Sequence, residues 1–440
     1  LSAQSNGDTL SLDVRTPFST NRATRIHVGT DNSIYLPLTS DGSQQVGVLK
    51  YESNGRIWDA SYGNTSPNGA ALVSLPTTID RVYDTHLTSS DEFMGVGRFS
   101  TTTPFGTFMV QVVGKFTPDG HLDSSYTYGS GANTVYGVKS FGIDGAGLNA
   151  TANNHSYGLT TAPSIGAVNN PVVVCGTYNT GTTTTPSGQT KGFVRVMTSS
   201  LDPHWQFNAD NSMFYSVAVQ SNGRVLVAGK TSTFAVVQRI TTTGGIDSTF
   251  NSTGTHNFGS FSQFDVVRIQ PDGKSVLAAR SGTNIAVVRL NVDGSLDSGF
   301  GTGGIAQLSL SATLGACYVN DITFHPTTGK IALAIVNDED KHAFAYLNTD
   351  GTPSNFFADS GLSGVRIYPD ANTVADMGVT GVAFQSTGAL VTFASINGNS
   401  SMLTRFALDV TPIGVEQLQA AQNLHLFPNP VRSNATLTYH

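Results

Sequence analysis

Charged side chains are scarce in this chain of 440 residues, since Asp, Glu, Lys and Arg together make up 12% of it. The net charge of -7 comes from scattered acidic residues, and Lys and Arg nowhere gather into a basic stripe. Contact with a phosphate backbone requires such a stripe. The sequence therefore predicts no nucleic-acid partner.

Long apolar runs and helical periodicity are missing too. The longest apolar run, around Val172 to Cys175, has the length of a strand, whereas a membrane-spanning helix needs about 20 apolar residues. No long stretch with a period of about 3.6 residues precedes Pro412. Gly, at 47 residues, is abundant. We therefore expect short strands joined by tight polar turns, and no membrane span.

One strand-rich unit recurs along the chain, and its clearest copies run from Tyr215 to Phe250 and from Phe264 to Phe300. In each copy an alternating segment leads into Asn-Gly or Asp-Gly and an apolar segment follows, which is typical of a β-hairpin. A third strand, a second turn and a fourth strand complete the unit. Repetition at about 50 residues is typical of propellers and solenoids.

Weaker copies bring the total to seven, with hairpin turns near residues 32, 91, 170, 222, 272, 328 and 387. Four antiparallel strands per copy make one blade of a propeller. The sequence therefore predicts an all-β fold, a seven-bladed β-propeller of four-stranded antiparallel blades over residues 1–410. An alternating segment at residues 9–15 precedes the first copy, and we expect residues 8–17 to complete the last blade and so remove an exposed edge.

One interval between turns is longer than the others, and its surplus lies at residues 127–169. This segment is rich in Gly, Asn and Ser. We interpret it as a polar loop that decorates one face of a rigid scaffold. Among the loops it is the leading candidate for a functional role.

The segments Gln270 to Lys274 and Arg289 to Gly304 carry a specific pattern, Gln-Pro-Asp-Gly-Lys and then Arg-Leu-Asn-Val-Asp-Gly-Ser-Leu-Asp-Ser-Gly-Phe-Gly-Thr-Gly-Gly. This pattern resembles the bacterial delta-60 repeat family of β-propellers. The resemblance implies a propeller in an exported bacterial protein, and it brings no common enzymatic activity. The sixth copy departs from the pattern, with Ser354 in place of Asp and Phe357 in the aromatic position.

The end of the chain carries a second resemblance. The element Phe427-Pro428-Asn429-Pro430, with Asn434 to Thr438 after it, looks like the start of the C-terminal sorting domain of the type IX secretion system of Bacteroidetes. The resemblance implies a linker at 411–424 and a sorting signal within 425–440, the beginning of a truncated β-sandwich. The implied partners are the type IX secretion machinery and an outer-membrane β-barrel shuttle, and the implied location is secreted or attached to the cell surface at the outer membrane.

The beginning of the chain fits export as well. Leu1-Ser2-Ala3-Gln4 looks like the tail of a removed signal peptide, because a small residue before a polar one suits the cleavage site. Export would place the two cysteines, Cys175 and Cys317, in an oxidising compartment. The repeat alignment puts them three blades apart, however, whereas a disulfide needs Cα atoms within about 7 Å. We therefore expect two buried, unbonded thiols.

Five copies end in an Asp-x-x-aromatic element. The pairs are Asp59 and Tyr62, Asp123 and Tyr126, Asp202 and Trp205, Asp247 and Phe250, and Asp297 and Phe300. A ring of carboxylates could bind a cation, but calcium loops have denser Asp spacing. The favoured interpretation is structural: the Asp closes an Asx-type turn and the aromatic residue fills the space between blades, since repetition in most blades is what a packing device requires.

Sequence motifs for catalysis and metal binding are absent: there is no Gly-x-Ser-x-Gly elbow, P-loop or His-x-x-x-His. We predict no catalytic residue, metal or cofactor. The favoured function is a secreted or cell-surface, non-catalytic binding or scaffold module with a surface glycan or protein as ligand. The alternative is a secreted hydrolase or lyase acting on polysaccharide, with carboxylates such as Asp144 and Asp210. Inward carboxyls about 5 to 10 Å apart would favour the enzyme, and a channel lined by Val, Ala and Thr would favour binding.

Overall fold

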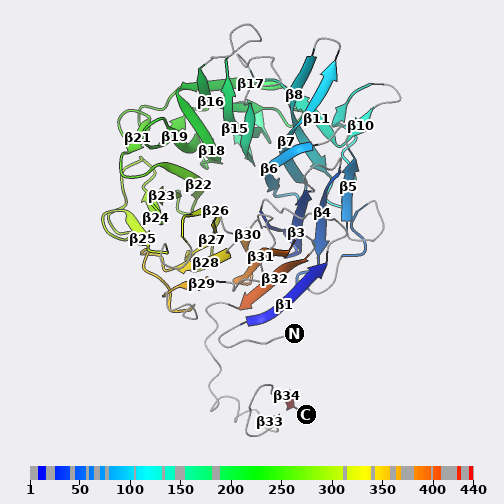
Figure 1. Ribbon diagram of the computed structural model, residues 1–440, viewed down its shortest axis with the longest axis vertical. Coiled ribbons are helices and arrows are strands. Elements are labelled where there is room, and N and C mark those ends of the chain that lie inside the picture. Colours follow the sequence, from blue (N-terminus) through cyan, green and yellow to red (C-terminus); the bar gives the residue numbers. More distant parts are fainter. Residues whose placement is uncertain are drawn as a thin grey trace.

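The computed structural model describes residues 8–15, 25–39, 45–55, 59–63, 70–74, 79–103, 106–130, 134–143, 154–180, 189–310, 315–337, 342–356, 363–367, 381–397, 400–407, 424–427 and 436–439. Every regular element in these ranges is a strand. The strands form seven four-stranded antiparallel sheets arranged in a ring, which confirms the predicted seven-bladed β-propeller (Figure 1). No helix in the described part of the chain is long and apolar enough to cross a membrane.

The first four blades follow one another along the chain, and each runs from its inner to its outer strand. Blade 1 contains β2 (His27–Val28), β3 (Ile34–Thr39), β4 (Gln45–Tyr51) and β5 (Ala70–Ser74). Blade 2 contains β6 (Ile79–Leu87), β7 (Phe93–Thr103), β8 (Gly106–Phe116) and β11 (Val138–Phe141). Blade 3 contains β12 (His155–Thr161), β15 (Val172–Asn179), β16 (Thr190–Met197) and β17 (Pro203–Asp210). Blade 4 contains β18 (Ser212–Val219), β19 (Val225–Thr231), β20 (Ala235–Ile240) and β21 (Thr255–Phe258).

The remaining blades complete the ring. Blade 5 contains β22 (Gln263–Ile269), β23 (Ser275–Ser281), β24 (Asn284–Leu290) and β25 (Ile305–Leu308). Blade 6 contains β26 (Cys317–Phe324), β27 (Ile331–Asn337), β28 (His342–Leu347) and β29 (Val365–Ile367). Blade 7 contains β30 (Gly381–Phe384), β31 (Ala389–Asn397), β32 (Ser400–Ala407) and, as its outer strand, β1 (Asp8–Arg15).

The hairpin turns lie where the repeats predict them. In each blade the turn that leads into the second strand contains a residue with positive φ, a conformation that glycine, asparagine and aspartate tolerate best. These residues are Asn32, Asp91, Asn170, Gly223, Gly273, Gly329 and Gly388. Two of these turns contain the Asn-Gly and Asp-Gly pairs of the sequence, and the others place Asn, Asp or Gly at the positive φ.

The interpretation of residues 127–169 as one loop is wrong. This stretch contains β11, the outer strand of blade 2, and β12, the inner strand of blade 3. It also contains two short ribbons, β9 (Thr127–Tyr128) with β10 (Val135–Tyr136) and β13 (Ser164–Ile165) with β14 (Val168–Asn169). The sequence of β12, His-Ser-Tyr-Gly-Leu-Thr-Thr, looked like a loop because an inner strand that faces the polar centre lacks an apolar run.

The ends of the propeller meet in blade 7. β1 pairs antiparallel with β32, with Leu12 opposite Leu403 and Arg15 opposite Ser400. The outer strand of blade 7 therefore precedes blade 1 in the sequence. Hydrogen bonds, rather than a loop, join it to the other three strands of the blade.

The described residues after Ala407 form a separate two-stranded ribbon. β33 (Leu424–Phe427) pairs with β34 (Thr436–Tyr439), and in the described part of the chain neither pairs with a blade strand. Phe427 is the last residue of β33. Pro428, Asn429 and Pro430 lie outside the described residues.

The core is divided among the seven junctions between blades. Each of the seven clusters of buried apolar residues draws its members from two neighbouring blades, and the junction of blades 7 and 1 has its own. Cys175 lies at the junction of blades 3 and 4, and Cys317 at that of blades 5 and 6. Both are buried and unbonded, as predicted, and burial raises the pKa of both thiols, that of Cys317 to about 11. Neither thiol is therefore reactive in the folded protein.

Removing residues 1–17 should lower the melting temperature by about 5 °C or more, because it deletes β1 and leaves β32 as an unpaired edge. Differential scanning calorimetry of the shortened chain measures this. A chain ending at Leu408 is the matched control, since it loses more residues but no blade strand, and its melting temperature should stay near that of the full chain. Equal melting temperatures for all three proteins would contradict closure by β1.

Candidate functional site

The Asp residues at the ends of the repeats share one geometry in blades 1, 2, 4 and 5. Each carboxylate accepts the backbone N–H of the residue two positions further on, at 2.9 to 3.1 Å. These bonds join Asp59 to Ser61, Asp123 to Ser125, Asp247 to Thr249 and Asp297 to Gly299. Each carboxylate also forms an ion pair, at 2.7 to 3.1 Å, with a basic residue near the end of the third strand. The basic partners are Lys50, Lys115, Arg239 and Arg289, in the same order.

Asp247 illustrates the electrostatics of these turns. Its side chain is 4% exposed, and the Nε atoms of Arg239 and Arg224 each lie 2.7 Å from its Oδ2. Burial alone would raise the pKa of Asp247, but hydrogen bonds from Thr249 and the two arginine charges outweigh burial and hold the pKa below its usual value. The carboxylate is therefore ionised at neutral pH and already paired with cations of the protein itself.

The aromatic residue of the element packs against the following blade. In three junctions it contacts a turn glycine, at which a Cβ atom would lie only 2.6 to 2.9 Å from the ring. These pairs are Tyr62 with Gly120, Phe250 with Gly294 and Phe300 with Gly351. Arg239 and Arg289 lie over the rings of Phe250 and Phe300, at 4.9 and 4.5 Å from the ring centroids. Their Nη1 atoms donate to carbonyl oxygens in the same turns. The whole element therefore links one blade to the next.

The prediction that Asp202 closes the same turn is wrong. β17 begins at Pro203, so the residues after Asp202 belong to a strand instead of a turn. The backbone N–H of Asp202 donates to Thr198 Oγ1 at 3.1 Å. Trp205 nevertheless contacts the next blade, since its Nε1 donates to the carbonyl of Thr242 at 3.0 Å and a Cβ at the neighbouring turn glycine would lie 3.0 Å from its ring.

The element varies in blades 2 and 6. Tyr126 meets a turn in which Leu201, with φ of 61°, replaces glycine, and its hydroxyl donates to the carbonyl of Ser199 at 2.6 Å. In blade 6, Ser354 replaces the Asp and Tyr346 occupies the position of the basic residue. Both charges of the pair are therefore lost together, as expected if each exists to neutralise the other. Phe357 lies outside the described residues.

These contacts account for the repeated carboxylates without a bound cation. Each lies at a separate junction and is paired with a side chain of the protein. Within the described ranges, no group of three or more His, Cys, Asp and Glu residues is placed to hold a metal ion.

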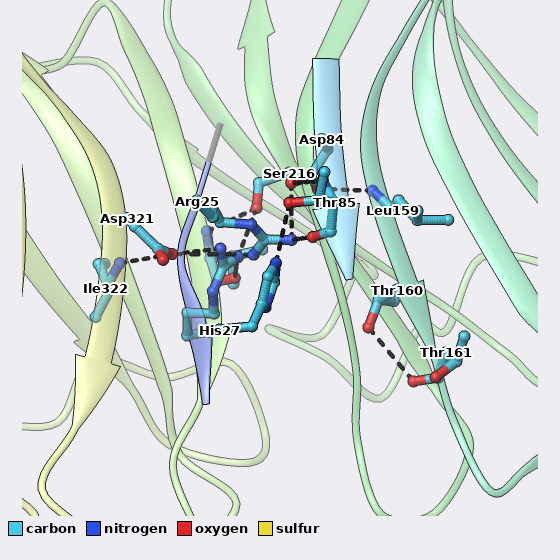
Figure 2. Close-up of polar contacts among 12 residues, drawn as sticks. Arg25, His27, Asp84, Thr85, Leu159, Thr160, Thr161, Ser216, Asp321 and Ile322 are labelled. Carbon is cyan, nitrogen blue, oxygen red and sulfur yellow. Dashed lines mark hydrogen bonds and ion pairs between the residues drawn. The ribbon is translucent and has the colours of Figure 1, made fainter. Parts of the chain in front are cut away.

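A different set of charges meets at the centre of the ring (Figure 2). Arg25, which precedes β2, lies 2.7 Å from Asp84 of β6. Arg268 of β22 lies 2.6 Å from Asp321 of β26, and Arg25 also lies 3.9 Å from Asp321. Their side chains are 7 to 21% exposed. This central network therefore joins strands from blades 1, 2, 5 and 6.

Hydrogen bonds extend the central network to blades 3 and 4. The backbone N–H of Leu159 donates to Asp84 Oδ2 at 2.8 Å, and Ser216 Oγ lies 3.3 Å from Arg268 Nη1. His27 Nε2 lies 2.9 Å from Thr85 Oγ1 (Figure 2). Six of the seven inner segments thus contribute to one polar network.

Burial governs the titration of these groups. It raises the pKa of Asp84, against the opposing effect of the Arg25 and Arg268 charges. Burial, together with the charges of Arg25 and Arg268, lowers the pKa of His86 to about 3. His27 shifts in the same direction for the same reasons. Both imidazoles are therefore neutral at physiological pH, and neither is a proton donor there.

Asp210, one of the two carboxylates named for an enzyme, does not lie in this network. Asp210 ends β17, an outer strand, where its side chain is 67% exposed and pairs with Lys191 at 2.8 Å. Asp144 lies outside the described residues. Two other inner-strand carboxylates of the described residues, Asp84 and Asp321, do lie in this network, and we did not single them out from the sequence. A signal was present, because each occupies the same place in its repeat, within a segment that should form an inner strand.

A cavity of about 780 Å³ lies beside His86, among the hairpin turns of blades 1, 2 and 3. Its volume falls in the range of about 300 to 1,000 Å³ that is usual for ligand pockets. Its charged groups are paired, with Asp91 accepting from Thr30 at 2.6 Å and Glu92 lying 2.8 Å from Lys115. The polar wall also carries the hydroxyl groups of Thr88, Ser89, Ser90 and Thr161. Such a lining suits a polar ligand.

The chain resembles known propellers in part of its sequence and in its fold. Residues 220–250 and 270–300, in blades 4 and 5, match the family described as a domain of unknown function (DUF5122) beta-propeller. No curated protein matches the chain. A catalytically inactive virginiamycin B lyase from Staphylococcus aureus, solved with quinupristin, is similar in structure, with a TM-score of 0.50, 10% identity and coverage of 90% of this chain and 98% of that one. At this identity the similarity shows the fold alone.

Two further solved structures are similar over shorter parts of this chain. The Dos1 propeller has 9% identity and a TM-score of 0.49, and the match covers 87% of this chain and 78% of that one. A protein of unknown function from Bacteroides caccae has 10% identity and a TM-score of 0.39, and the match covers 76% of this chain and 98% of that one.

Replacing Gly294 by Ala should destabilise the protein by more than about 1 kcal/mol, because a Cβ there would lie 2.6 Å from Phe250 and the residue has φ of 88°. Gly282→Ala is the matched control, since φ is 63° and no atom lies within 4 Å of its Cβ position. Urea denaturation of both variants separates the steric effect from backbone strain. Equal losses of unfolding free energy in the two would show that the ring contact is unimportant.

Replacing Asp321 by Ala should cost about 3 to 5 kcal/mol of unfolding free energy, because it leaves Arg268 without its buried partner. The matched control is Asp210→Ala, which breaks an exposed ion pair and should cost less than about 1 kcal/mol. Urea denaturation measures both. A loss at Asp321 no larger than that at Asp210 would contradict the importance of the central network.

Proposed function

We propose that the protein is a secreted or cell-surface, non-catalytic binding module, built on a rigid propeller and exported by the type IX secretion system. The observation that carries the non-catalytic part is the pairing of the two carboxylates of the central network. Asp84 and Asp321 each face an arginine at 2.6 to 2.7 Å, and Asp84 also accepts two backbone N–H groups. A general acid or base must exchange a proton with substrate, and carboxylates held in this way serve the scaffold instead.

Support for binding comes from the cavity of about 780 Å³ among the turns of blades 1 to 3. Its walls are mainly short hairpin turns held by a closed ring of sheets, so a ligand would meet hydroxyl groups that are already in place. The preferred ligands are a surface glycan or a surface protein. A propeller fold by itself specifies no function, so the proposal rests on these groups and not on the similarity to a lyase.

The export part of the proposal rests on the sequence at the two ends of the chain. The element Phe427 to Pro430 is the resemblance that carries it, and residues 411–440 would then act as linker and sorting signal. The partners would be the secretion machinery and its outer-membrane β-barrel shuttle.

A ligand screen tests the binding function. The full chain is labelled and applied to arrays of glycans and of bacterial and host surface proteins, and the same glycans are incubated with it and analysed for cleavage by mass spectrometry. We expect retention of one ligand class without cleavage. Cleaved or unsaturated glycan products would instead establish the alternative, a hydrolase or lyase acting on polysaccharide.

A chain ending at Leu408 should fold normally but fail to reach the cell surface when it is expressed in its natural host. Surface labelling with an antibody, alongside the full chain, measures this. Circular dichroism of the purified shorter chain controls for folding. Normal surface display of the shorter chain would refute the sorting function.

A further inference from the structure

The inner strands of several blades share an irregularity in their pairing at equivalent positions. At an equivalent point in blades 2 to 6 the inner strand carries an extra residue relative to the second strand, which is the signature of a β-bulge, and β6 has a second irregularity between Ile79 and Arg81. The extra residues are Tyr83, Tyr157, Tyr215, Asp265 and Asn320. All five residues are partly exposed, although the side chain of Asp265 is only 8% exposed, and the residue before each is buried. Because the bulge lies at an equivalent position in five blades, it places one residue from each inner strand at the same height along the axis of the ring.

We propose that this set of bulge residues forms a saccharide-binding surface, in which the tyrosines stack on pyranose rings. The inference rests on the proposed binding function and assigns it a site and a ligand class. The tyrosines occupy three consecutive blades, and the polar residues Asp265 and Asn320 occupy the next two. The surface is therefore aromatic on one side of the ring and polar on the other.

The aromatic side is continuous across blades 2, 3 and 4. The Tyr83 hydroxyl lies 2.8 Å from His155 Nδ1, and the His155 ring stacks on Tyr157 with centroids 5.1 Å apart and an interplanar angle of 3°. Tyr157 also contacts Tyr83 and Tyr215, at centroid distances of 5.5 and 5.2 Å. The rings hold one another in place, so binding would require little further ordering of side chains.

The cationic groups of two basic side chains lie over two of these rings. Arg98 lies 5.9 Å from the Tyr83 centroid and Lys230 lies 6.0 Å from that of Tyr215. On the polar side, Arg280 is 36% exposed and pairs with Asp265 at 2.9 Å. Arg98 and Lys230 supply hydrogen-bond donors next to the rings.

A pyranose ring fits this combination. One of its faces carries C–H groups, which pack against the negative face of an aromatic ring, and its edge carries hydroxyl groups, which accept from arginine and lysine. The bulge surface and the cavity lie on opposite sides of the central network along β6, since Tyr83 precedes Asp84 and His86 follows it. A ligand on the tyrosines therefore need not enter the cavity.

The test is calorimetric titration of the full chain with soluble xylan, polygalacturonate and chitin oligosaccharides. Three variants accompany the natural protein. Tyr215→Leu removes the aromatic face but keeps an apolar side chain, Tyr215→Phe keeps the face, and Tyr136→Leu changes a tyrosine that is 53% exposed outside the bulge surface. Melting temperatures confirm that each variant is folded.

We expect one of these saccharides to bind, with an affinity reduced about tenfold or more by Tyr215→Leu and nearly unchanged in the other two variants. Binding that all three variants retain would overturn the site but leave the proposed binding function in place. Absence of binding to every saccharide would overturn the ligand class, and a protein ligand found in the surface-protein screen would then show that the binding function itself survives.

Discussion

Every blade of this protein depends on its neighbours, because a four-stranded sheet cannot bury both of its faces alone. The apolar clusters accordingly lie between blades, and the junction of blades 7 and 1 must be sealed like the other six. β1 completes blade 7 by pairing with β32. The ring is therefore a single cooperative unit, although its sequence is a chain of similar pieces.

Ion pairs connect the blades both at the periphery of the ring and at its centre. At the periphery, an ion pair between an Asp and a basic residue lies where one blade contacts a turn of the next. Blade 6 lacks both charges of this pair. At the centre, Arg25, Asp84, Arg268 and Asp321 link blades that are distant in sequence. Buried ion pairs add little net stability but penalise any arrangement that leaves one charge unpaired. We infer that the central network favours the correct closure of the ring over alternatives.

The repeats differ in the residue at the bulge, where we propose the binding surface. Blades 4 and 5 follow the family pattern most closely, yet their bulges carry Tyr215 and Asp265, two side chains of opposite character. The bulge belongs to the backbone of the repeat, so the residue placed on it can change without affecting the sheet. A rigid scaffold with exchangeable residues at one level is suited to recognition.

The sequence by itself determined the repeat count, the hairpin turns and the unbonded state of Cys175 and Cys317, because these follow from local turn chemistry and from register within one unit. It also indicated the spare strand that becomes β1. It misassigned β12 and the turn at Asp202, since a polar inner strand and a shortened loop carry no local signal that distinguishes them. Only the tertiary structure brought Arg25 and Asp84 to Arg268 and Asp321, and Tyr83 to Tyr157 and Tyr215. Such contacts join residues from different blades, and their partners are set by closure of the ring rather than by any spacing along the chain.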